Sequence, residues 1–335
     1  MGRDDIIEAV EPALFDLHPD DEAGFDALAR QVYRYQLKHC DVYRRYCKEK
    51  SFADWASVPY LLVDAFKHAP ITTFPPESAK RIFLSSGTGR SMPSKHYVRD
   101  LALYERSVTE HFEAVFGDGP FTLVAHLPHY SERGEQSSLV HMVQTLIDRY
   151  GDEHSGFFLD NREPLNAAIA HSREQRTDFI LFGAAFGLLD LIDDTAIQLP
   201  DGALVIETGG MKTHRQSVTR DELHGRLSER FGVPESAVWS EYGMCELMSQ
   251  CYTRGDHVFR PPPWMRIRIV DPENPTKEVP EGEPGALTVF DLANLHSVSA
   301  LATEDRAVQT EDGFKVLGRL SDAELRGCNF LMEST

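Results

Sequence analysis

The sequence predicts an α/β fold of mainly parallel sheets with flanking helices, followed by a small C-terminal β-rich subdomain. The first observation is an alternation of strand-like and helical stretches that begins at Phe121, which is typical of parallel strands joined by crossover helices. The second is a change after residue 255, where a proline cluster precedes shorter strand-like runs. We therefore expect residues 1–255 to form an α/β core with an N-terminal helical segment, and residues 256–335 to form the β-rich subdomain.

The N-terminal part begins with a predicted helix from Gly24 to Lys48, because apolar side chains recur there at helical spacing. Four prolines between residues 59 and 76 then favour extended pieces and turns. A strand-like run at Ile82–Leu84 leads into a loop of serine, threonine and glycine residues. Residues 100–116 again carry apolar side chains on one helical face, and Gly117 is typical of a helix end.

From Phe121 onward, strand-like runs alternate with helical runs. The strand-like runs are Phe121–Leu127, Gly156–Leu159, Phe179–Phe182, Ala203–Ile206 and Val238–Ser240, and the helical runs are Ser138–Tyr150, Leu165–Arg173, Ala185–Ile192 and Arg220–Phe231. Thr219, followed by Glu222, is a capping-box signature for the start of the last helix. In the β-rich part, strands are expected at Met265–Val270, Ala286–Leu292 and Phe314–Leu317.

The composition excludes several classes of protein. With 34 basic and 53 acidic residues the net charge is -19, so we expect no nucleic-acid or anionic-membrane binding through the overall field. No run of about 18 apolar residues occurs, which predicts no membrane span. The five cysteines lack CxxC spacing and the N-terminus lacks the apolar core of a signal peptide. We therefore expect free thiols and a cytoplasmic protein.

The stretch from Ala203 to Gln250 holds the central candidate site. Its two strand-like runs end in the turns Glu207-Thr208-Gly209-Gly210-Met211-Lys212 and Glu241-Tyr242-Gly243-Met244-Cys245-Glu246. Ligands of open parallel sheets bind at the carboxyl ends of the strands, so these two turns are expected side by side. Paired glycines permit close approach of a ring or a phosphate, Tyr242 could stack on a base, and Glu246 could hold Mg²⁺. The alternatives are an ordinary β-to-α turn, a core tyrosine and a surface glutamate.

A second candidate is the loop Ser85-Ser86-Gly87-Thr88-Gly89-Arg90, which follows a strand-like run. Backbone N–H groups and hydroxyls in such a loop can wrap a phosphate, although a plain turn has the same composition. The loop matches none of the P-loop, GxGxxG and GxSxG patterns. Nearer the C-terminus, Asp305 is expected at a strand end, where it could accept hydrogen bonds from ribose, with Arg319 as a nearby cation. Both residue types are also common in solvated turns.

The order of these motifs resembles the adenylate-forming superfamily, which comprises acyl- and aryl-CoA ligases, luciferases and carrier-domain adenylation domains. Within it the chain is most similar to the LuxE-type acyl-protein synthetases, the fatty-acid-activating subunits of bacterial luminescence reductases. The segments that carry the resemblance are SSGTGRSMPSKH, SSLVHMV, ETGGMKTHRQSVTRDELH, SEYGMCELMSQCY, PPPWMR, FDLANLHS and VLGRLSDAELRGCN. The resemblance implies the fold of an adenylate-forming enzyme's N-terminal domain.

The resemblance also implies a role for each motif. In the nucleotide site it places Ser85, Ser86, Gly87, Thr88, Gly89 and Arg90 at the ATP phosphates, Gly209, Gly210, Met211, Tyr242 and Gly243 around the adenine, and Asp305 with Arg319 at the ribose. Glu246 would bind Mg²⁺, and the β-rich subdomain would complete this site. The acyl pocket would be bordered by Ala185, Phe186 and Gly187, with His129 and Tyr130 near the carboxylate.

Three departures from the superfamily pattern leave part of the chemistry open. The chain ends soon after Arg319, whereas the superfamily continues into a domain whose lysine promotes adenylation, so we expect no separate lysine-bearing C-terminal domain. Lys212 and Lys95 are the candidates to replace that lysine. In addition, the phosphate loop reads SSGTGRS instead of SSGTTG, and Cys245 stands where threonine is commonest. These two changes could weaken ATP binding or be neutral.

The acceptor of the acyl group is a further open point. LuxE-type synthetases pass it to a cysteine near their C-terminus, and Cys328 is the only cysteine in that region of the sequence. If Cys328 instead packs within the fold as a small apolar residue, CoA or a carrier-protein thiol would be the acceptor.

The sequence therefore predicts an acid–thiol ligase, which activates a fatty or aryl acid with ATP and transfers the acyl group to a thiol. Two alternatives stay open: an ATP-independent acyltransferase that uses a preformed thioester, and a non-catalytic binding subunit of a partner reductase or synthase. The predicted cofactors are ATP and Mg²⁺, with CoA as one candidate acceptor. The expected partners are a small-molecule carboxylic acid and a carrier protein or acyl-reductase, and the chain could also form an oligomer.

Overall fold

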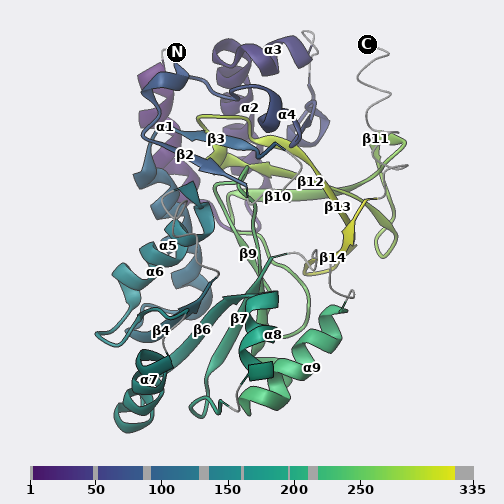
Figure 1. The fold of residues 1–335 in the computed structure, drawn as a ribbon. Coiled ribbons are helices and arrows are strands. Elements are labelled where there is room, and N and C mark those ends of the chain that lie inside the picture. The colour runs from purple at the N-terminus through teal and green to yellow at the C-terminus, as the bar shows by residue number, and fades with distance from the viewer. Residues whose placement is uncertain are drawn as a thin grey trace. The chain divides into compact units, whose positions relative to one another are not determined.

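The structure, a computed structural model, describes residues 3–47, 52–85, 92–127, 136–159, 162–194, 197–209 and 218–320, drawn as ribbons in Figure 1. The chain divides into two compact units. Unit 1 comprises residues 1–107, 244–249 and 261–335, and unit 2 comprises residues 108–243 and 250–260. This division differs from the expected boundary at residue 255, because the C-terminal strands belong to the same unit as the N-terminal helices.

Unit 2 is built on a six-stranded sheet in the order β5-β4-β6-β7-β8-β9. Its strands are β4 (Phe121–His126), β5 (Gly156–Phe157), β6 (Asp178–Ala184), β7 (Leu204–Thr208), β8 (Val238–Tyr242) and β9 (Cys251–Tyr252). Neighbouring strands from β5 to β8 are parallel, and β9 is antiparallel to β8. The predicted parallel sheet is thus confirmed, and the carboxyl ends of β6, β7 and β8 lie next to one another.

The helices of unit 2 are α6 (Ser138–Tyr150), α7 (Arg162–Gln175), α8 (Ala185–Asp194), α9 (Arg220–Phe231) and the second half of α5 (Leu101–Phe116). Helices α7, α8 and α9 share one apolar core with the sheet, in which Leu188 and Leu227 are buried together with Val205 of β7. The predicted capping box of α9 is present, since Thr219 and Glu222 each accept a hydrogen bond from the other's backbone N–H. Burial of this shared core holds the strand ends in place.

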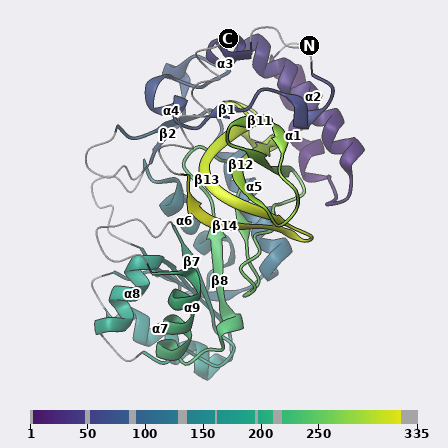
Figure 2. The same cartoon turned by 90° about the vertical axis from the view of Figure 1, so that its right-hand side faces the viewer.

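Unit 1 contains a second six-stranded sheet, in which the strand order is β1-β13-β12-β10-β11 and β14 pairs with β13. Its strands are β1 (Leu61–Leu62), β10 (Met265–Asp271), β11 (Asn274–Glu278), β12 (Pro284–Asp291), β13 (Ala300–Thr310) and β14 (Gly313–Arg319). Strand β13, the long curved yellow strand in Figure 2, changes register against both β12 and β14. Such bulges bend a strand.

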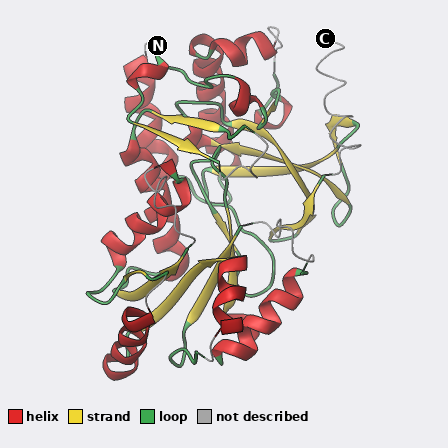
Figure 3. Cartoon of the chain, viewed as in Figure 1, coloured by secondary structure: helices red, strands yellow, loops and turns green. Residues whose placement is uncertain are grey.

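The helices of unit 1, red in Figure 3, are α1 (Arg3–Phe15), α2 (Glu22–His39), α3 (Asp41–Cys47), α4 (Ala65–His68) and the first half of α5. The helix expected over Gly24–Lys48 is divided at Cys40, where the backbone is extended. Strands β2 (Arg81–Leu84) and β3 (Lys95–Val98) form a separate antiparallel pair. Single 3₁₀ turns lie at Trp55–Ser57, Pro76–Ser78, Glu235–Ala237 and Leu292–Asn294.

Strand β13 is the main element that the sequence analysis does not predict. Its residues 303–306, Thr-Glu-Asp-Arg, have the composition of a polar turn, yet they lie within the strand. Asp305 and Arg306 pair with Arg319 and Gly318 of β14, and Arg306 also pairs with Ala286 of β12. Asp305 therefore lies inside a strand, which corrects the expectation that it stands at a strand end. No helix in the described ranges has both the length and the apolar character that a membrane crossing requires.

Candidate functional site

In unit 1, Glu246 lies in a short segment, residues 244–249, whose backbone is held by buried side chains. The Nδ1 of His96, on β3, lies 2.8 Å from the carbonyl oxygen of Cys245. The side-chain amide of Asn294 donates a hydrogen bond of 2.8 Å to the carbonyl oxygen of Glu246 itself. Because His96 and Asn294 are both buried, the Glu246 carboxyl group is presented by a firmly anchored backbone.

The carboxyl group of Glu246 is buried beside groups that favour its charged form. Burial raises the pKa of Glu246, whereas a hydrogen bond with Ser94 and the positive charges of Arg319 and Lys67 act in the opposite direction. Glu246 keeps 7% of its surface exposed. A carboxylate oxygen in such surroundings is a suitable ligand for a hard divalent cation.

The two cations near Glu246 belong to a chain of ion pairs. Arg319 contacts both Glu304 and Asp305 at 3.0 Å, because Asp305 on β13 and Arg319 on β14 are register partners. Lys67, on α4, lies 2.7 Å from Asp64 and 3.9 Å from Glu304. The hydrogen bond with Asp64 raises the pKa of Lys67. We name this group the Glu246 cluster: Asp64, Lys67, Ser94, Glu246, Glu304, Asp305 and Arg319.

Ser85 connects the predicted phosphate loop to this cluster. Its N–H donates a hydrogen bond of 3.1 Å to the carbonyl oxygen of Ser94, and the N–H of Ser94 donates one of 2.9 Å to the Oγ of Ser85. Ser85 therefore lies at the base of the loop, paired with the residue that contacts Glu246. The remaining loop residues, Ser86, Gly87, Thr88, Gly89 and Arg90, lie outside the described part of the chain.

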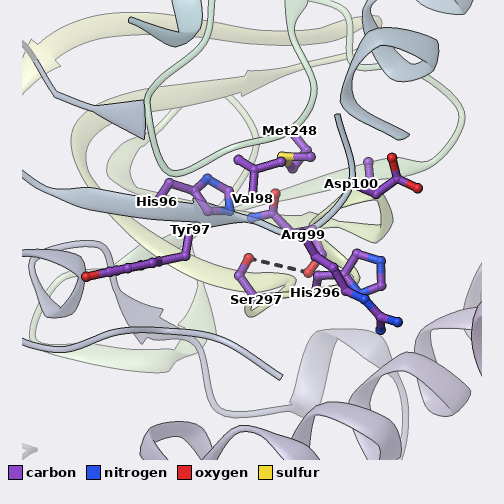
Figure 4. A pocket seen from close by; sticks show the side chains of 10 residues that line it. His96, Tyr97, Val98, Arg99, Asp100, Met248, His296 and Ser297 are labelled. Carbon is purple, nitrogen blue, oxygen red and sulfur yellow. Dashed lines mark hydrogen bonds between the residues drawn. The ribbon is translucent and has the colours of Figure 1, made fainter. Parts of the chain in front are cut away.

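A small pocket in unit 1 adjoins the anchored segment (Figure 4). It is lined by residues 96–100 of β3 and its continuation, together with Met248, Ala293, Asn294, His296 and Ser297. The pocket has room for little more than a water molecule. Burial lowers the pKa of His96 to about 4, so this histidine is neutral near pH 7. Two of its lining residues, His96 and Asn294, hold the backbone of residues 244–249, and the pocket itself is too small for a nucleotide or an organic acid.

In unit 2, the described residues expected to contact the adenine base and the carboxylic acid substrate lie at the carboxyl ends of three neighbouring strands. Gly209 follows β7, Tyr242 ends β8, and residues 185–187 begin α8 directly after β6. Gly209 has φ +95°, and no described atom lies within 4 Å of an added Cβ, so a flat ligand can approach its backbone. Tyr242 is half-buried, and its ring centroid lies 5.7 Å from that of Phe259. Open α/β sheets bind ligands at this edge.

A second buried carboxyl group, that of Glu241, links the ends of β7 and β8. It accepts a hydrogen bond from the hydroxyl of Thr208, its register partner. Burial raises the pKa of Glu241 to about 7; the hydrogen bond from Thr208 opposes this rise, and the charge of Glu207 adds to it. A Cβ on Gly243 would lie 2.5 Å from Glu241 Oε1, so a side chain at Gly243 would displace this carboxyl group.

His126 joins the residues expected around the acyl group. It ends β4, and its Nδ1 lies 2.9 Å from the carbonyl oxygen of Phe158. A Cβ added to Gly187 would lie 3.5 Å from the His126 ring. Ala185 is buried, and Phe186 packs partly buried against the apolar core of unit 2. The carboxyl ends of β4 and β6 therefore offer an imidazole beside a small residue and an aromatic ring.

Several expected site residues lie outside the described ranges, so their roles stay predictions. Besides residues 86–90, they are His129, Tyr130, Gly210, Met211, Lys212 and Cys328. Lys67 and His126 were not expected. His126 is the last residue but one of the predicted strand Phe121–Leu127, which is a usable signal, whereas nothing in the sequence around Lys67 distinguishes it from a surface lysine. Lys95, the other candidate lysine, is exposed at the start of β3.

The family of the protein follows from the sequence as a whole. A family model described as "Acyl-protein synthetase, LuxE" matches residues 3–335. The chain belongs to this family. The resemblance of its motifs to LuxE-type synthetases is thereby confirmed. No curated protein matches the chain.

Solved structures give the fold of this LuxE-family chain. It is similar to 2-hydroxyisobutyryl-CoA ligase in an open conformation with 2-HIB-AMP and CoA, with a TM-score of 0.66 and 14% identity over 90% of this chain and 70% of that one. It is also similar to ATP-bound MatB from Rhodopseudomonas palustris, with a TM-score of 0.53 and 18% identity over 74% of this chain and 49% of MatB. These proteins are adenylate-forming ligases, so the predicted fold of an adenylate-forming N-terminal domain is confirmed.

Proposed function

We propose that this LuxE-family protein uses ATP to activate a fatty or aryl carboxylic acid as an acyl-adenylate, and then transfers the acyl group to a thiol. The observation that carries the proposal is the surroundings of Glu246, a buried carboxyl group that has Ser94, Arg319 and Lys67 as neighbours. Sites for nucleoside triphosphates combine an acidic metal ligand with cations in this way. The family match supports the same reaction.

The donors of the Glu246 cluster fit a Mg²⁺ ion, which is usually held by one or two carboxylates together with phosphate oxygens and water. The cluster has two cations and four carboxyl groups, so its fully charged form has a net charge of 2 − 4 = −2, which a divalent ion balances. Glu246 would be the metal ligand, and Ser94 would orient it. The ion, when bound, neutralises charge on the phosphates. Asp305, held by Arg319 at 3.0 Å, would accept hydrogen bonds from ribose.

The proposed reaction consists of two displacements. A carboxylate oxygen of the acid attacks the α-phosphorus of ATP, the bond from that phosphorus to the bridging oxygen breaks, and pyrophosphate leaves with the electron pair. A thiolate, formed when the acceptor thiol loses its proton, then attacks the acyl carbon, and AMP leaves as the thioester forms. The protein's part is to orient the reactants and to stabilise negative charge. Lys67 and Arg319 are the described cations assigned to this task.

We assign recognition of the adenine and the acid to the strand ends of unit 2. Tyr242 offers a partly exposed aromatic ring, and the open space at Gly209 admits a flat base to the backbone of residues 209–211. Residues 185–187 and His126 would border the acyl group. The imidazole of His126 suits the polar carboxylate of the acid, and the apolar side chains suit its apolar tail.

We propose Cys328 as the first candidate for the acceptor thiol, with CoA or a carrier-protein thiol as alternatives. The four described cysteines, Cys40, Cys47, Cys245 and Cys251, are all buried, so none of them is placed to receive an acyl group. Radiolabelled acid and ATP should leave a hydroxylamine-sensitive label on the wild type and none on Cys328→Ser, which should still form the adenylate. Label that persists in the variant, or that requires added CoA, would assign the transfer to another thiol.

We further propose a cytoplasmic location and a carrier protein or acyl-reductase as the partner. The described cysteines are free thiols, as is usual in a reducing compartment. A thioester is an activated acyl group, so we infer that a second protein takes the acyl group onward.

The direct test of activation is acid-dependent exchange of labelled pyrophosphate into ATP with Mg²⁺, run over short, long-chain and aromatic acids. We expect exchange with one class of acid, and none without acid. No exchange with any acid, from a protein shown to be folded, would contradict the proposal. Acyl transfer from a preformed thioester without ATP would then identify an acyltransferase, and nucleotide binding without turnover would identify a binding subunit.

A further inference from the structure

Two histidines and an aspartate gather at one edge of unit 2. Asp152 and His154 lie between α6 and β5, and His171 lies in α7, which packs against β4 and β6 (Figure 1). The three side chains offer ligand atoms that all lie within 4.8 Å of one another. His171 Nε2 is 3.5 Å from Asp152 Oδ2, and the centroids of the two imidazole rings are 3.9 Å apart.

The carboxylate of Asp152 is oriented by hydrogen bonds. Its Oδ2 accepts one from the Thr122 hydroxyl at 2.5 Å, and its Oδ1 accepts one from the N–H of His154 at 2.9 Å and one from the Ser155 hydroxyl at 3.1 Å. Partners of this kind fix the ligands of metal sites. The side chain therefore needs no rearrangement to present an oxygen to His171.

His154 carries a polar atom without a hydrogen bond. Its Nδ1 is buried and has no hydrogen-bond partner among the described residues, and the nearest carboxylate oxygen, Oε1 of Glu153, is 3.9 Å away, which is beyond hydrogen-bond distance. An unpaired buried nitrogen costs free energy, and a bound ion would remove that cost. The side chains of Asp152, His154 and His171 keep 12%, 33% and 18% of their surface exposed, so an ion can reach them from solvent.

We propose that Asp152, His154 and His171 bind a divalent transition-metal ion, and that Zn²⁺ is the ion they take. Imidazole nitrogens and carboxylate oxygens bind Zn²⁺ at about 2.0–2.2 Å, so two ligands of a tetrahedral ion lie about 3.4 Å apart. The 3.5 Å between His171 and Asp152 matches this spacing. The two rings are nearly parallel, with an angle of 16° between them, so the more exposed His154 must rotate to aim a nitrogen at the same ion. Water would complete the coordination.

The position of this site indicates a structural role. Thr122 and Thr177, whose hydroxyls are 2.8 Å apart, lie at the amino ends of β4 and β6, beside Asp152. The proposed binding sites of the adenine and the carboxylic acid lie at the opposite edge of the same sheet, at the carboxyl ends of its strands. Ligands and catalytic residues of α/β proteins lie at that edge. An ion at the amino ends would tie the loop between α6 and β5 to α7. It would therefore stabilise unit 2 and leave adenylation unchanged.

The test uses the full chain without a histidine tag, stripped of metal with a chelator and kept in excess Mg²⁺ to fill sites for hard cations. Calorimetric titration should show one Zn²⁺ per chain, and Zn²⁺ should raise the unfolding temperature. His154→Gln and His171→Gln should each lower Zn²⁺ affinity by about tenfold or more and abolish the rise. His18→Gln changes an exposed histidine of unit 1 and should bind Zn²⁺ like the wild type.

Nitrogen NMR of the histidine rings gives an independent readout, since the signals of His154 and His171 should shift when Zn²⁺ is added. Unchanged affinity in both glutamine variants, or an equal loss in His18→Gln, would overturn the proposal. Variants that are folded by circular dichroism and no longer bind Zn²⁺ would establish it. Because binding and unfolding are measured, the result does not depend on the proposed ligase activity.

Discussion

Glu241 and Glu246 are buried glutamates in the same stretch of sequence, but they have different neighbours. Glu241, in unit 2, is hydrogen-bonded to a neutral hydroxyl and lies near the negative charge of Glu207. Glu246, in unit 1, has a hydroxyl and the cations Arg319 and Lys67 in its surroundings. Burial raises the pKa of both carboxyl groups, and positive charge opposes that rise at Glu246.

The contrast separates a carboxyl group with a structural role, Glu241, from the proposed metal ligand, Glu246. With a pKa of about 7, Glu241 is largely protonated in mildly acidic solution, and it serves as a hydrogen-bonded link between β7 and β8. Burial raises the pKa of Glu246 as well, but Ser94, Arg319 and Lys67 oppose that rise and so favour the carboxylate, which is the form that binds a metal ion. Two glutamates of similar burial are thus expected to respond differently to the same substitution.

Glu246→Gln should cause the strongest loss of activity. Glutamine keeps the size of the side chain but removes the negative charge and is a poorer ligand for Mg²⁺. Acid-dependent pyrophosphate exchange should therefore fall by about 100-fold or more. Glu241→Gln is the matched control and should keep the exchange rate within about threefold, as expected of a change that leaves the reacting groups untouched. Equal losses in two folded variants would erase the distinction between the two glutamates.

Lys67→Met tests whether positive charge sets Glu246 apart. Methionine keeps much of the aliphatic stem and removes the charge, so the rate of exchange at saturating ATP should drop by about 10- to 30-fold, the value of one charged contact. Lys95→Met changes an exposed lysine of the same unit and should leave the rate unchanged. Loss of activity in Lys95→Met alone would move the role to that lysine.

Asp305→Asn should act on nucleotide recognition. Asp305, the proposed ribose acceptor, loses its charge and its ion pair with Arg319. The KM for ATP should therefore rise by about five- to tenfold, with the KM for the acid unchanged. The variant should also lose its preference for ATP over 2′,3′-dideoxy-ATP. Glu304→Gln removes the other ion pair of Arg319 and should retain that preference. A preference lost in both variants would assign the effect to Arg319 and not to a ribose contact.

The secondary-structure elements that carry these residues differ in whether they could be predicted from the sequence. The parallel strands of unit 2 and the start of α9 could be predicted, because strand–helix alternation and a capping box are local patterns. Strand β13 could not, because its charged residues resemble a turn until β14 is known to pair with them. The contact of Asp305 with Arg319 exists only through that register.

The residues of the candidate sites also differ in whether they could be predicted from the sequence. Glu246 and Tyr242 stand in a short motif and could be predicted from it. Lys67 could not, because its place near Glu304 depends on how α4 packs in unit 1. Likewise Asp152 and His154 are close in sequence, but His171 joins them only once α7 is packed against the sheet.

The smallest expected effect is a change in the free energy of unfolding with pH, which follows from the raised pKa of Glu241. The carboxyl group of Glu241 has an ordinary pKa of 4.5 and a folded-state pKa of about 7. Below pH 4.5 both the folded and the unfolded chain hold this proton. As the pH rises from 4.5 to 7 the unfolded chain releases the proton while the folded chain keeps it, so the free energy of unfolding falls, by an amount on the order of 3 kcal/mol. Above pH 7 this contribution no longer changes.

Glu241→Gln removes that titration while keeping an oxygen that accepts from Thr208. Urea unfolding should therefore give the variant and the wild type similar stability at pH 5, and should make the variant the more stable of the two at pH 8. Glu235→Gln, at an exposed glutamate of the same unit, should follow the wild type at both pH values. A variant that is less stable than the wild type at pH 8 would mean that Glu241 works as a carboxylate, and the contrast with Glu246 would then rest on the cations alone.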